Sequence, residues 1–524
     1  MKRIYKILTL ILALIMLMSV LGSCGMLGKL FNKGEASSDS SDVNDGSLSV
    51  SDSDSVSEPY DDSDSVSETE DDRSAVEQSG LEIRDMKGQA FNIWNSLDSF
   101  WAPNPMDVTD KDNLTDVITK AGYSRNQKLT NELNVVLYYE NSDTNPSNQS
   151  AANYDKLALS TLWQAGIEKY DMVFTGAYPS SSLAIEGFYT DLLQCEEIHT
   201  DAKYYEAQVN KQIRFFDRQF FAMGYYSAKN TNALEATFVN TMILDSITKG
   251  SVTINDLYEL ALDHKWTMKE LLELGNLYAI DTNTGVWATD QYSAIVSYNG
   301  AHSIYYWLGG DVIGWNEASN RYNCTLNSAA NINLLDWIRT NITKDTRFGI
   351  VKSDKQFEAF IGGAAPFLIT DMSNIDQIMN AAGLEWAILP PPCYEEGDDY
   401  RSFSTGWNIN FAGIPSACLD IDKAAYLYEM FMCFSYDYVY PAYYEKCFET
   451  QYMPDATSAQ VFDLIAHSRY VDIDNVYGLG ASSRIKGLIQ SDTASIPETL
   501  TTVSASISNK LVDLKTTFEN NGSR

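Results

Sequence analysis

The sequence predicts an α/β protein in which mostly parallel sheets are covered by helices, and two observations support this fold class. From about residue 81 onward, short apolar runs alternate with helical patterns. The 524 residues, of which 44% are hydrophobic, are enough for two or three domain-sized bodies with packed cores. The apolar runs that we expect to form strands are residues 91–95, 135–139, 172–175, 220–224, 366–370, 386–389 and 409–412.

Helices are expected between these strands because apolar residues recur there at helical spacing. Residues 154–168 place Leu157 and Ile167 near one helical face. Thr267 and Glu270 form a capping-box pattern at the start of another helix. The end of the chain predicts a closing helix with one buried stripe. The residues of that stripe are Leu500, Val503, Ile507, Leu511, Leu514 and Phe518.

The N-terminus has the pattern of an export signal. Lys2, Arg3 and Lys6 precede an uncharged run of 14 residues, which is shorter than the roughly 20 residues of a permanent membrane-spanning helix. The tetrapeptide Leu-Gly-Ser-Cys that ends at Cys24 resembles the bacterial lipobox. This resemblance implies a signal peptide over residues 1–23, lipidation of Cys24 and a mature chain anchored to the outer face of a membrane. An uncleaved signal anchor is the alternative.

Residues 24–79 are expected to form a lipid-anchored, disordered linker. From residue 35 to residue 79 the segment is built almost wholly from Ser, Asp, Glu and Val, and it holds 15 acidic residues and one arginine. The heptapeptide of residues 52–58 recurs at residues 62–68. Such a segment cannot bury enough apolar surface to offset the entropy of ordering, so it should extend and repel itself.

The net charge of −34 argues against partners that are themselves anionic. Sequence-independent binding to nucleic acid depends on positively charged side chains that are attracted to phosphates. Binding to acidic lipid headgroups depends on positively charged side chains as well. We therefore expect no nucleic-acid partner and favour a neutral or cationic one.

The search for catalytic patterns is mostly negative. The four histidines are widely separated, and neither a zinc-binding H-E-x-x-H pair, nor a nucleophile elbow, nor a phosphate-binding loop is present. Carboxylate pairs such as Asp281 with Asp290, or Glu395 with Glu396, could serve glycoside hydrolysis, but in so acidic a chain chance pairing is abundant. We expect no enzyme activity, no bound metal and no cofactor.

Six cysteines follow Cys24, and none of them is spaced as a C-x-x-C motif. A body of more than 400 residues does not need disulfides for stability, so mostly buried or free thiols are favoured over at least one disulfide. These cysteines are Cys195, Cys324, Cys393, Cys418, Cys433 and Cys447.

Aromatic residues recur where the predicted strands give way to loops. Trp101 follows the first strand, Tyr178 follows the strand at 172–175, Tyr225 follows the segment at 220–224, and Trp407 precedes the strand at 409–412. In open α/β sheets, ligands bind beyond the carboxyl ends of strands. An aromatic face suits the C–H groups of a sugar ring, while Asp, Asn and Gln take the hydroxyls. Ordinary core packing is the alternative for each ring.

Six passages in order resemble the extracellular solute-binding proteins of family 1, the receptors of ABC importers. YDMVF at 170–174 with LAIEGFYTDL at 183–192 is similar to one signature passage of that family, and FAMG at 221–224 is similar to the strand before the hinge. The other four are KWTMKEL at 265–271, LGGD at 308–311, FEAFIGGAAP at 357–366 and WAILP at 386–390.

This resemblance implies two α/β lobes of the periplasmic-binding-protein type II, joined by hinge strands with a ligand cleft between them. Lobe one should comprise residues 80–228 plus 404–455, and lobe two residues 234–400 plus 457–524. The receptor would be a monomer that closes over a sugar or oligosaccharide and delivers it to a membrane permease. The ligand-binding residues carried over are Trp101, Tyr178, Tyr225, Asn299, Trp307, Asp371 and Trp407.

Two other functions stay open at this point: a surface glycan-binding adhesin or sensor subunit, and a secreted glycoside-active enzyme. The first would share the fold and lack a permease, and the second would cleave its ligand. A peptide or polyamine ligand also stays open, because aromatic faces and an acidic body would suit either.

Overall fold

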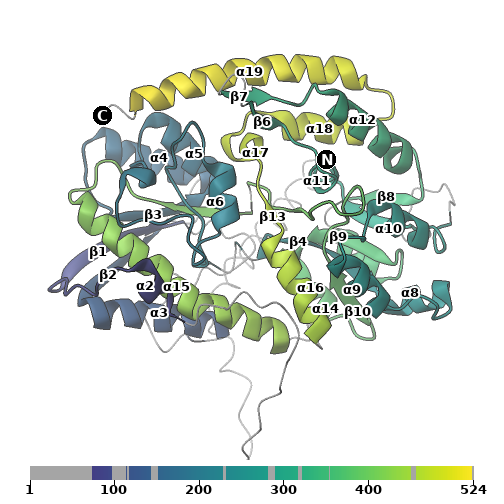
Figure 1. Ribbon diagram of the computed structural model, residues 1–524, viewed down its shortest axis with the longest axis horizontal. Coiled ribbons are helices and arrows are strands. Elements are labelled where there is room, and N and C mark those ends of the chain that lie inside the picture. Colours follow the sequence, from purple (N-terminus) through teal and green to yellow (C-terminus); the bar gives the residue numbers. More distant parts are fainter. Residues whose placement is uncertain are drawn as a thin grey trace, which may run out of the picture. The chain divides into compact units, whose positions relative to one another are not determined.

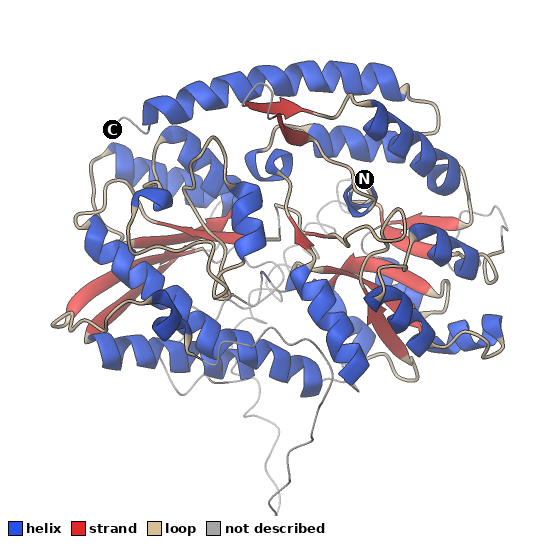
Figure 2. Cartoon of the chain, in the orientation of Figure 1, coloured by secondary structure: helices blue, strands red, loops and turns tan. Residues whose placement is uncertain are grey.

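The computed structural model describes residues 73–96, 114, 117–142, 151–227, 230, 232–280, 290–316, 321–352, 355–406, 408–449 and 456–521. All of them belong to one compact unit, residues 71–524. Its two larger sheets each have their own covering helices (Figure 2). We call the unit around the four-stranded sheet lobe one, and the unit around the five-stranded sheet lobe two.

Lobe one is built on a sheet with the strand order β12-β3-β1-β2. β1 pairs in parallel with both β2 and β3, whereas β12 runs antiparallel to β3. Phe174 of β3 packs against Tyr226 and Phe431, with ring centroids 4.8 and 5.4 Å away. The elements of lobe one are α2 (Ala75–Ser79), β1 (Gln89–Asn95), α3 (Val117–Leu133), β2 (Val135–Asn141), α4 (Ala151–Gln164), β3 (Met172–Gly176), α5 (Ala177–Glu186), η4 (Leu192–Gln194), α6 (Ala207–Ile213), β12 (Asn410–Gly413) and α15 (Ile421–Glu449).

Lobe two has the strand order β10-β4-β9-β5-β8. β5 runs parallel to β8 and β9, and β4 runs antiparallel to both of its neighbours. Trp266 is fully buried here, and its indole N–H donates to the Pro390 carbonyl at 3.1 Å. The elements are β4 (Glu235–Asn240), α8 (Thr241–Thr248), α9 (Ile254–Leu262), α10 (Met268–Gly275), β5 (Ala294–Ser297), α11 (Ser303–Trp307), β6 (Ile313–Asn316), β7 (Arg321–Cys324), α12 (Ala329–Ile338), η5 (Arg339–Thr343), β8 (Phe348–Val351), α13 (Gln356–Ile361), β9 (Phe367–Asp371), η6 (Met372–Asn374), α14 (Ile375–Met379), β10 (Trp386–Leu389) and α16 (Ala456–His467).

The remaining elements connect the lobes. β11 (Ser402–Phe403) and β13 (Arg469–Tyr470) pair in parallel where the chain passes between the two larger sheets. α17 (Ile473–Tyr477), α18 (Ala481–Ile489) and α19 (Ile496–Asn521) follow. α19 contacts α5 of lobe one as well as α12 and β7 of lobe two, and Figure 1 shows it as the long yellow helix.

The closing helix is confirmed: all six residues of its predicted stripe are buried in α19. Six of the seven predicted strands are also present. The strand predicted at 220–224 is wrong, because this segment makes only isolated bridges at Ala222 and Gly224. Ala222 exchanges two backbone hydrogen bonds with Ala412 of β12, at 2.8 and 2.9 Å. The pairing does not continue at Met223, whose N–H donates to the Asn210 side chain at 2.8 Å and whose carbonyl accepts from the Asn210 side chain at 3.0 Å.

The buried face predicted for residues 154–168 is also wrong. Leu157 and Ile167 are 58% and 49% exposed, while Asp155 and Leu159 of α4 are buried. Asp155 accepts a hydrogen bond from the Ser96 hydroxyl at the end of β1. This buried polar contact fixes which face of α4 points inward, and hydrophobic spacing does not reveal it.

Candidate functional site

Three of the predicted functional residues lie outside the described residues: Cys24, Trp101 and Trp407. Residues 97–113 and 143–150, which follow β1 and β2, lie outside them too. The candidate site is therefore built from the strand ends and from the segment that crosses between the lobes.

The carboxyl edge of the sheet in lobe one carries polar side chains and Tyr178. Asn95 at the end of β1 is buried and donates to the Asn141 side chain of β2 at 2.9 Å. Tyr178 follows β3 in the first turn of α5 and is half-buried. A Cβ atom at Gly406 would lie 3.1 Å from the Tyr178 ring, so the crossing segment passes directly against it. Burial and the nearby charge of Asp474 raise the pKa of Tyr178 to about 12.

At the carboxyl edge of the sheet in lobe two, several side chains surround Glu235. The sequence did not predict a role for this residue. Asp371, at the end of β9, pairs with Glu235 across the antiparallel β4–β9 ladder. The Glu235 carboxyl accepts from the Trp307 indole at 2.6 Å and from the Ser303 hydroxyl at 2.8 Å. Burial raises its pKa well above the usual range, and the neighbouring charge of Asp371 acts in the same direction.

Trp307 and Asn299 occupy different environments in this lobe. Trp307 is 2% exposed, so protein atoms cover its ring and no face is open to a ligand in this arrangement. Asn299 is exposed in the turn after β5. The structure thus brings Trp307 and Asp371 together around Glu235 and leaves Asn299 at the surface. The binding roles of all three stay predictions.

Both carboxyl edges meet the same stretch of backbone, the crossing segment 402–410. Ser402 accepts from the Glu235 N–H at 2.7 Å and donates to the Glu235 carbonyl at 2.9 Å. Gly406 lies against Tyr178, and Asn410 begins the strand β12. Trp407 belongs to this segment by sequence. In α/β folds this is the position of a ligand site, beyond the carboxyl ends of parallel strands.

A tyrosine-rich recess adjoins the crossing segment and includes Tyr225. The Tyr225 ring lies 4.4 Å from the ring of Tyr440 and 5.4 Å from that of Tyr436, measured between centroids. Tyr443 and Phe462 stack nearby at 6.3 Å. The free volume of the recess is about 10 Å³, which is room for about one water molecule. A sugar ring could therefore reach these faces only after the lobes move apart.

A buried charge pair closes the recess. The Arg469 side chain is 2% exposed, and its Nε lies 3.4 Å from the Glu206 carboxylate. Its Nη1 donates to the Ser404 hydroxyl at 3.0 Å, whereas Nε makes no hydrogen bond with any described residue. Arg469 thus joins Glu206 of lobe one to Ser404 of the crossing segment. Glu206 and Arg469 were not predicted, because a lone Arg and a lone Glu carry no motif.

The described residues include no group of three or more His, Cys, Asp or Glu side chains placed to hold a metal ion. Burial raises the pKa of the Cys195 and Cys418 thiols to about 11, and the nearby carboxylates act in the same direction, so neither is an activated nucleophile. Cys195, Cys324, Cys393, Cys418 and Cys433 carry free thiols. No helix in the described part of the chain has both the length and the apolar character needed to cross a membrane.

The chain matches no family model and no curated protein sequence. Solved structures do share its fold. A cyclo/maltodextrin-binding protein in complex with maltotetraose is 13% identical with a TM-score of 0.52, and the match covers 80% of this chain and 97% of that one. The GacH receptor of Streptomyces glaucescens, solved unliganded and with acarbose and an acarbose homolog, is 12% identical with a TM-score of 0.50, over 81% and 99% of the two chains.

The chain has the fold of these two-lobed binding proteins. A further similar structure, with 14% identity and a TM-score of 0.47, is the ABC substrate-binding protein Lmo0181 of Listeria monocytogenes in complex with cycloalternan. That match covers 81% of this chain and 99% of the other. Within the binding-protein fold, the crossing segment 402–410 takes the place between the lobes at which both sheets end.

Proposed function

We propose that this chain is the solute-binding receptor of an ABC importer, and that it binds a sugar or oligosaccharide between its lobes. The observation that carries the proposal is the meeting of both carboxyl edges at the crossing segment 402–410, beside a recess lined by tyrosines. The two solved structures with TM-scores of 0.50 and 0.52 support it, because the first was solved with acarbose and the second, a cyclo/maltodextrin-binding protein, with maltotetraose.

In this proposal the residues that contact the ligand are Tyr178, Tyr225, Asn299 and Asp371, together with Trp101 and Trp407 from the loops. Aromatic faces would stack on sugar rings, and the amide and carboxyl groups would bond to hydroxyls. Trp307 would act through Glu235, by holding its carboxyl in place. The lobe boundaries proposed are residues 80–228 plus 404–455, and residues 234–400 plus 457–524.

The same proposal places the receptor outside the cytoplasm, tethered by a lipid on Cys24, with the residues between Cys24 and α2 as a spacer. The linker expected from the sequence is too long at its end, because residues 75–79 form α2, where Ala75 is fully buried and its N–H donates to Asp437. A permease in that membrane would accept the solute from the closed form. The receptor itself would act as a monomer and catalyse no reaction.

Titration calorimetry against a panel of mono- and oligosaccharides, peptides and polyamines tests the function. We expect saturable binding of a glycan, and chromatography of the ligand afterwards should recover it intact. A cleaved glycan would show an enzyme instead. Binding confined to peptides or polyamines, or no binding by any member of the panel, would contradict the sugar-receptor proposal.

A further inference from the structure

The turn Gly478-Leu479-Gly480 joins two helices that pack on different lobes. α17, before the turn, contacts α5 and α6 of lobe one, whereas α18, after the turn, contacts α12 and η5 of lobe two. Gly478 has a φ of 61° and Gly480 a φ of 107°. Residues with a side chain rarely adopt these backbone conformations, and glycine moves out of them at little cost. The turn therefore depends on glycine at both positions, and it forms a joint between two packed helices.

Asp474 reaches across this joint from α17 to the start of α18. Its carboxylate accepts from the Ala481 N–H at 2.8 Å, from the Ser482 N–H at 3.0 Å and from the Ser482 hydroxyl at 3.1 Å. Asp474 is 1% exposed. A carboxylate at the N-terminus of a helix satisfies N–H groups that the helix leaves unpaired, and hydrogen bonds to an ionised group are the stronger kind. Asp474 thus ties the helix docked on lobe one to the helix docked on lobe two.

The same contacts extend into the functional site. The Ser482 and Tyr306 hydroxyls are hydrogen-bonded at 3.0 Å, and Tyr306 belongs to α11 in lobe two. Asn475, the neighbour of Asp474, accepts from the N–H of Gly406 in the crossing segment. A rearrangement at the joint would therefore disturb the hydrogen bond between Asn475 and Gly406 of the crossing segment.

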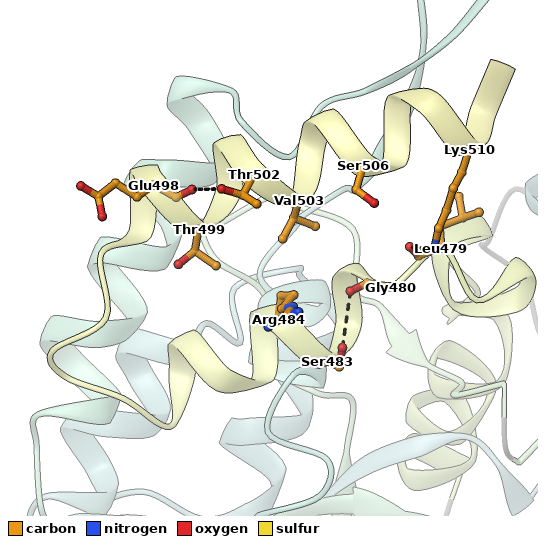
Figure 3. Close-up of a pocket in the computed structure, with 10 residues that line it drawn as sticks. All are labelled: Leu479, Gly480, Ser483, Arg484, Glu498, Thr499, Thr502, Val503, Ser506 and Lys510. Carbon is orange, nitrogen blue, oxygen red and sulfur yellow. Dashed lines mark hydrogen bonds between the residues drawn. The ribbon is translucent and has the colours of Figure 1, made fainter.

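The outer side of the joint is held by Lys510. Its ammonium group donates to the Leu479 carbonyl at 2.6 Å, and Figure 3 shows the side chain reaching from α19 to the turn. A groove of about 620 Å³ lies on this side, between α18 and α19. The joint is thus held on its buried side by the hydrogen bonds of Asp474 and on its outer side by the hydrogen bond of Lys510.

We propose that Asp474 and Lys510 form a latch that holds the two lobes in the arrangement described here, and that the Gly478–Gly480 turn is a pivot for their movement. The latch goes beyond solute binding: it concerns the position of the lobes, whichever solute occupies the site. Opening it breaks the hydrogen bonds of Asp474 and Lys510. α17, which packs on lobe one although it lies within the range 457–524 proposed for lobe two, then moves with lobe one while α18 stays with lobe two.

Hydrogen exchange measured by mass spectrometry on the full chain tests the latch. We expect Asp474→Ala to speed exchange by about 10-fold at residues 478–482, as the loss of charge-assisted hydrogen bonds implies. The decisive expectation is that α5 and α6 of lobe one also exchange faster, because lobe one then moves away from α19 and β13, which contact these two helices. Exchange in β5 and β9 should not change, whereas a general loss of stability would raise it there too.

Lys510→Met provides a second test, since Lys510 is exposed and its loss should not impair folding. It should speed exchange at the same three segments by a smaller factor. Asp513→Ala and Lys515→Met, which change exposed charges elsewhere on α19, are the matched controls and should behave as wild type. Faster exchange confined to residues 478–482 in both latch variants, with α5 and α6 unchanged, would overturn the latch proposal and leave sugar binding unaffected.

Discussion

Four acidic residues near the crossing between the lobes have raised pKa values, and burial is the largest cause for each. They are Glu235, Asp371, Asp472 and Asp474. Each is held by donors, but these donors do not fully offset the loss of hydration. This part of the molecule therefore gives up charge more readily than an ordinary acidic surface does as the pH falls.

Asp472 gives a pH-dependent prediction. Burial and neighbouring carboxylates raise its pKa to about 7, above the ordinary value of 3.8. Between these two values the folded protein binds a proton that the unfolded chain has released, so stability should fall as the pH rises from about 4 to 7. The groups that face Asp472 are Asp474, Asp311, Tyr470, Tyr305, Tyr306 and Arg401.

Asp472→Asn should flatten this part of the pH profile, because an amide does not titrate. Urea unfolding at pH 5 and at pH 8 measures the effect. The free energy of unfolding should differ less between the two pH values in the variant than in the wild type. An equal or larger difference in the variant would show that other groups carry the pH dependence.

Tyr225 carries a prediction for ligand binding. Its ring packs on Tyr436 and Tyr440 and lines the recess beside the crossing segment. If a sugar ring stacks there, Tyr225→Ala should weaken glycan affinity by roughly 5- to 10-fold, which corresponds to about 1 kcal/mol. Calorimetric titration is the measurement. Tyr138→Ala on β2, where the ring is 57% exposed, is the control that should leave affinity unchanged.

At the scale of the element, α19 is the case in which sequence and structure agree best. A stripe spaced by three and four residues predicts one buried helical face, and all six residues are buried. Ile507 is fully buried, whereas Val512 on the opposite side is 65% exposed. Ile507→Ala should lower the free energy of unfolding by about 2–5 kcal/mol, and Val512→Ala by about 0.5 kcal/mol or less. Denaturant titrations of both variants measure this, and equal losses would contradict the burial assigned here.

The segment at 220–224 and the buried face of the helix α4 were predicted wrongly, because the spacing of hydrophobic residues does not reveal the side-chain hydrogen bonds that decide their structure. The segment at 220–224 has the composition of a strand, but it pairs with β12 only at Ala222, and the Asn210 side chain bonds the backbone of Met223. α4 turns inward the face that bears Asp155, although Leu157 would be the hydrophobic choice. In both cases a buried side-chain hydrogen bond between residues distant in sequence decides the outcome.

The candidate site was predictable to a smaller extent than the fold. The rule that ligands bind at strand ends singled out Tyr178 and Tyr225, and the family resemblance added Asp371 and Trp307. The binding roles of these residues stay predictions, and the Trp307 ring is covered by protein and donates to Glu235. Glu235, Glu206 and Arg469 were missed because their importance comes from tertiary contacts, which leave no local pattern.

At the scale of the whole molecule, the binding-protein fold predicts that a bound solute holds the two lobes together. A ligand at 100 times its dissociation constant should stabilise the folded protein by about 2.7 kcal/mol, which raises the melting temperature by at least a few degrees. A thermal-shift titration with the glycan identified by calorimetry measures this. The shift should grow with ligand concentration and disappear with a non-binding sugar of similar size.

The passage of the chain between the lobes also has a consequence for biogenesis. The sheet of lobe one is complete only when β12, at residues 410–413, pairs with β3 at residues 172–176. Pairing across so long a loop is slow, because the loop must close before the contacts repay its entropy. A chain threaded through a secretion channel from its N-terminus would therefore stay without a finished lobe until most of it had crossed. In the proposed exported receptor, the same topology would delay completion of lobe one until most of the chain had crossed.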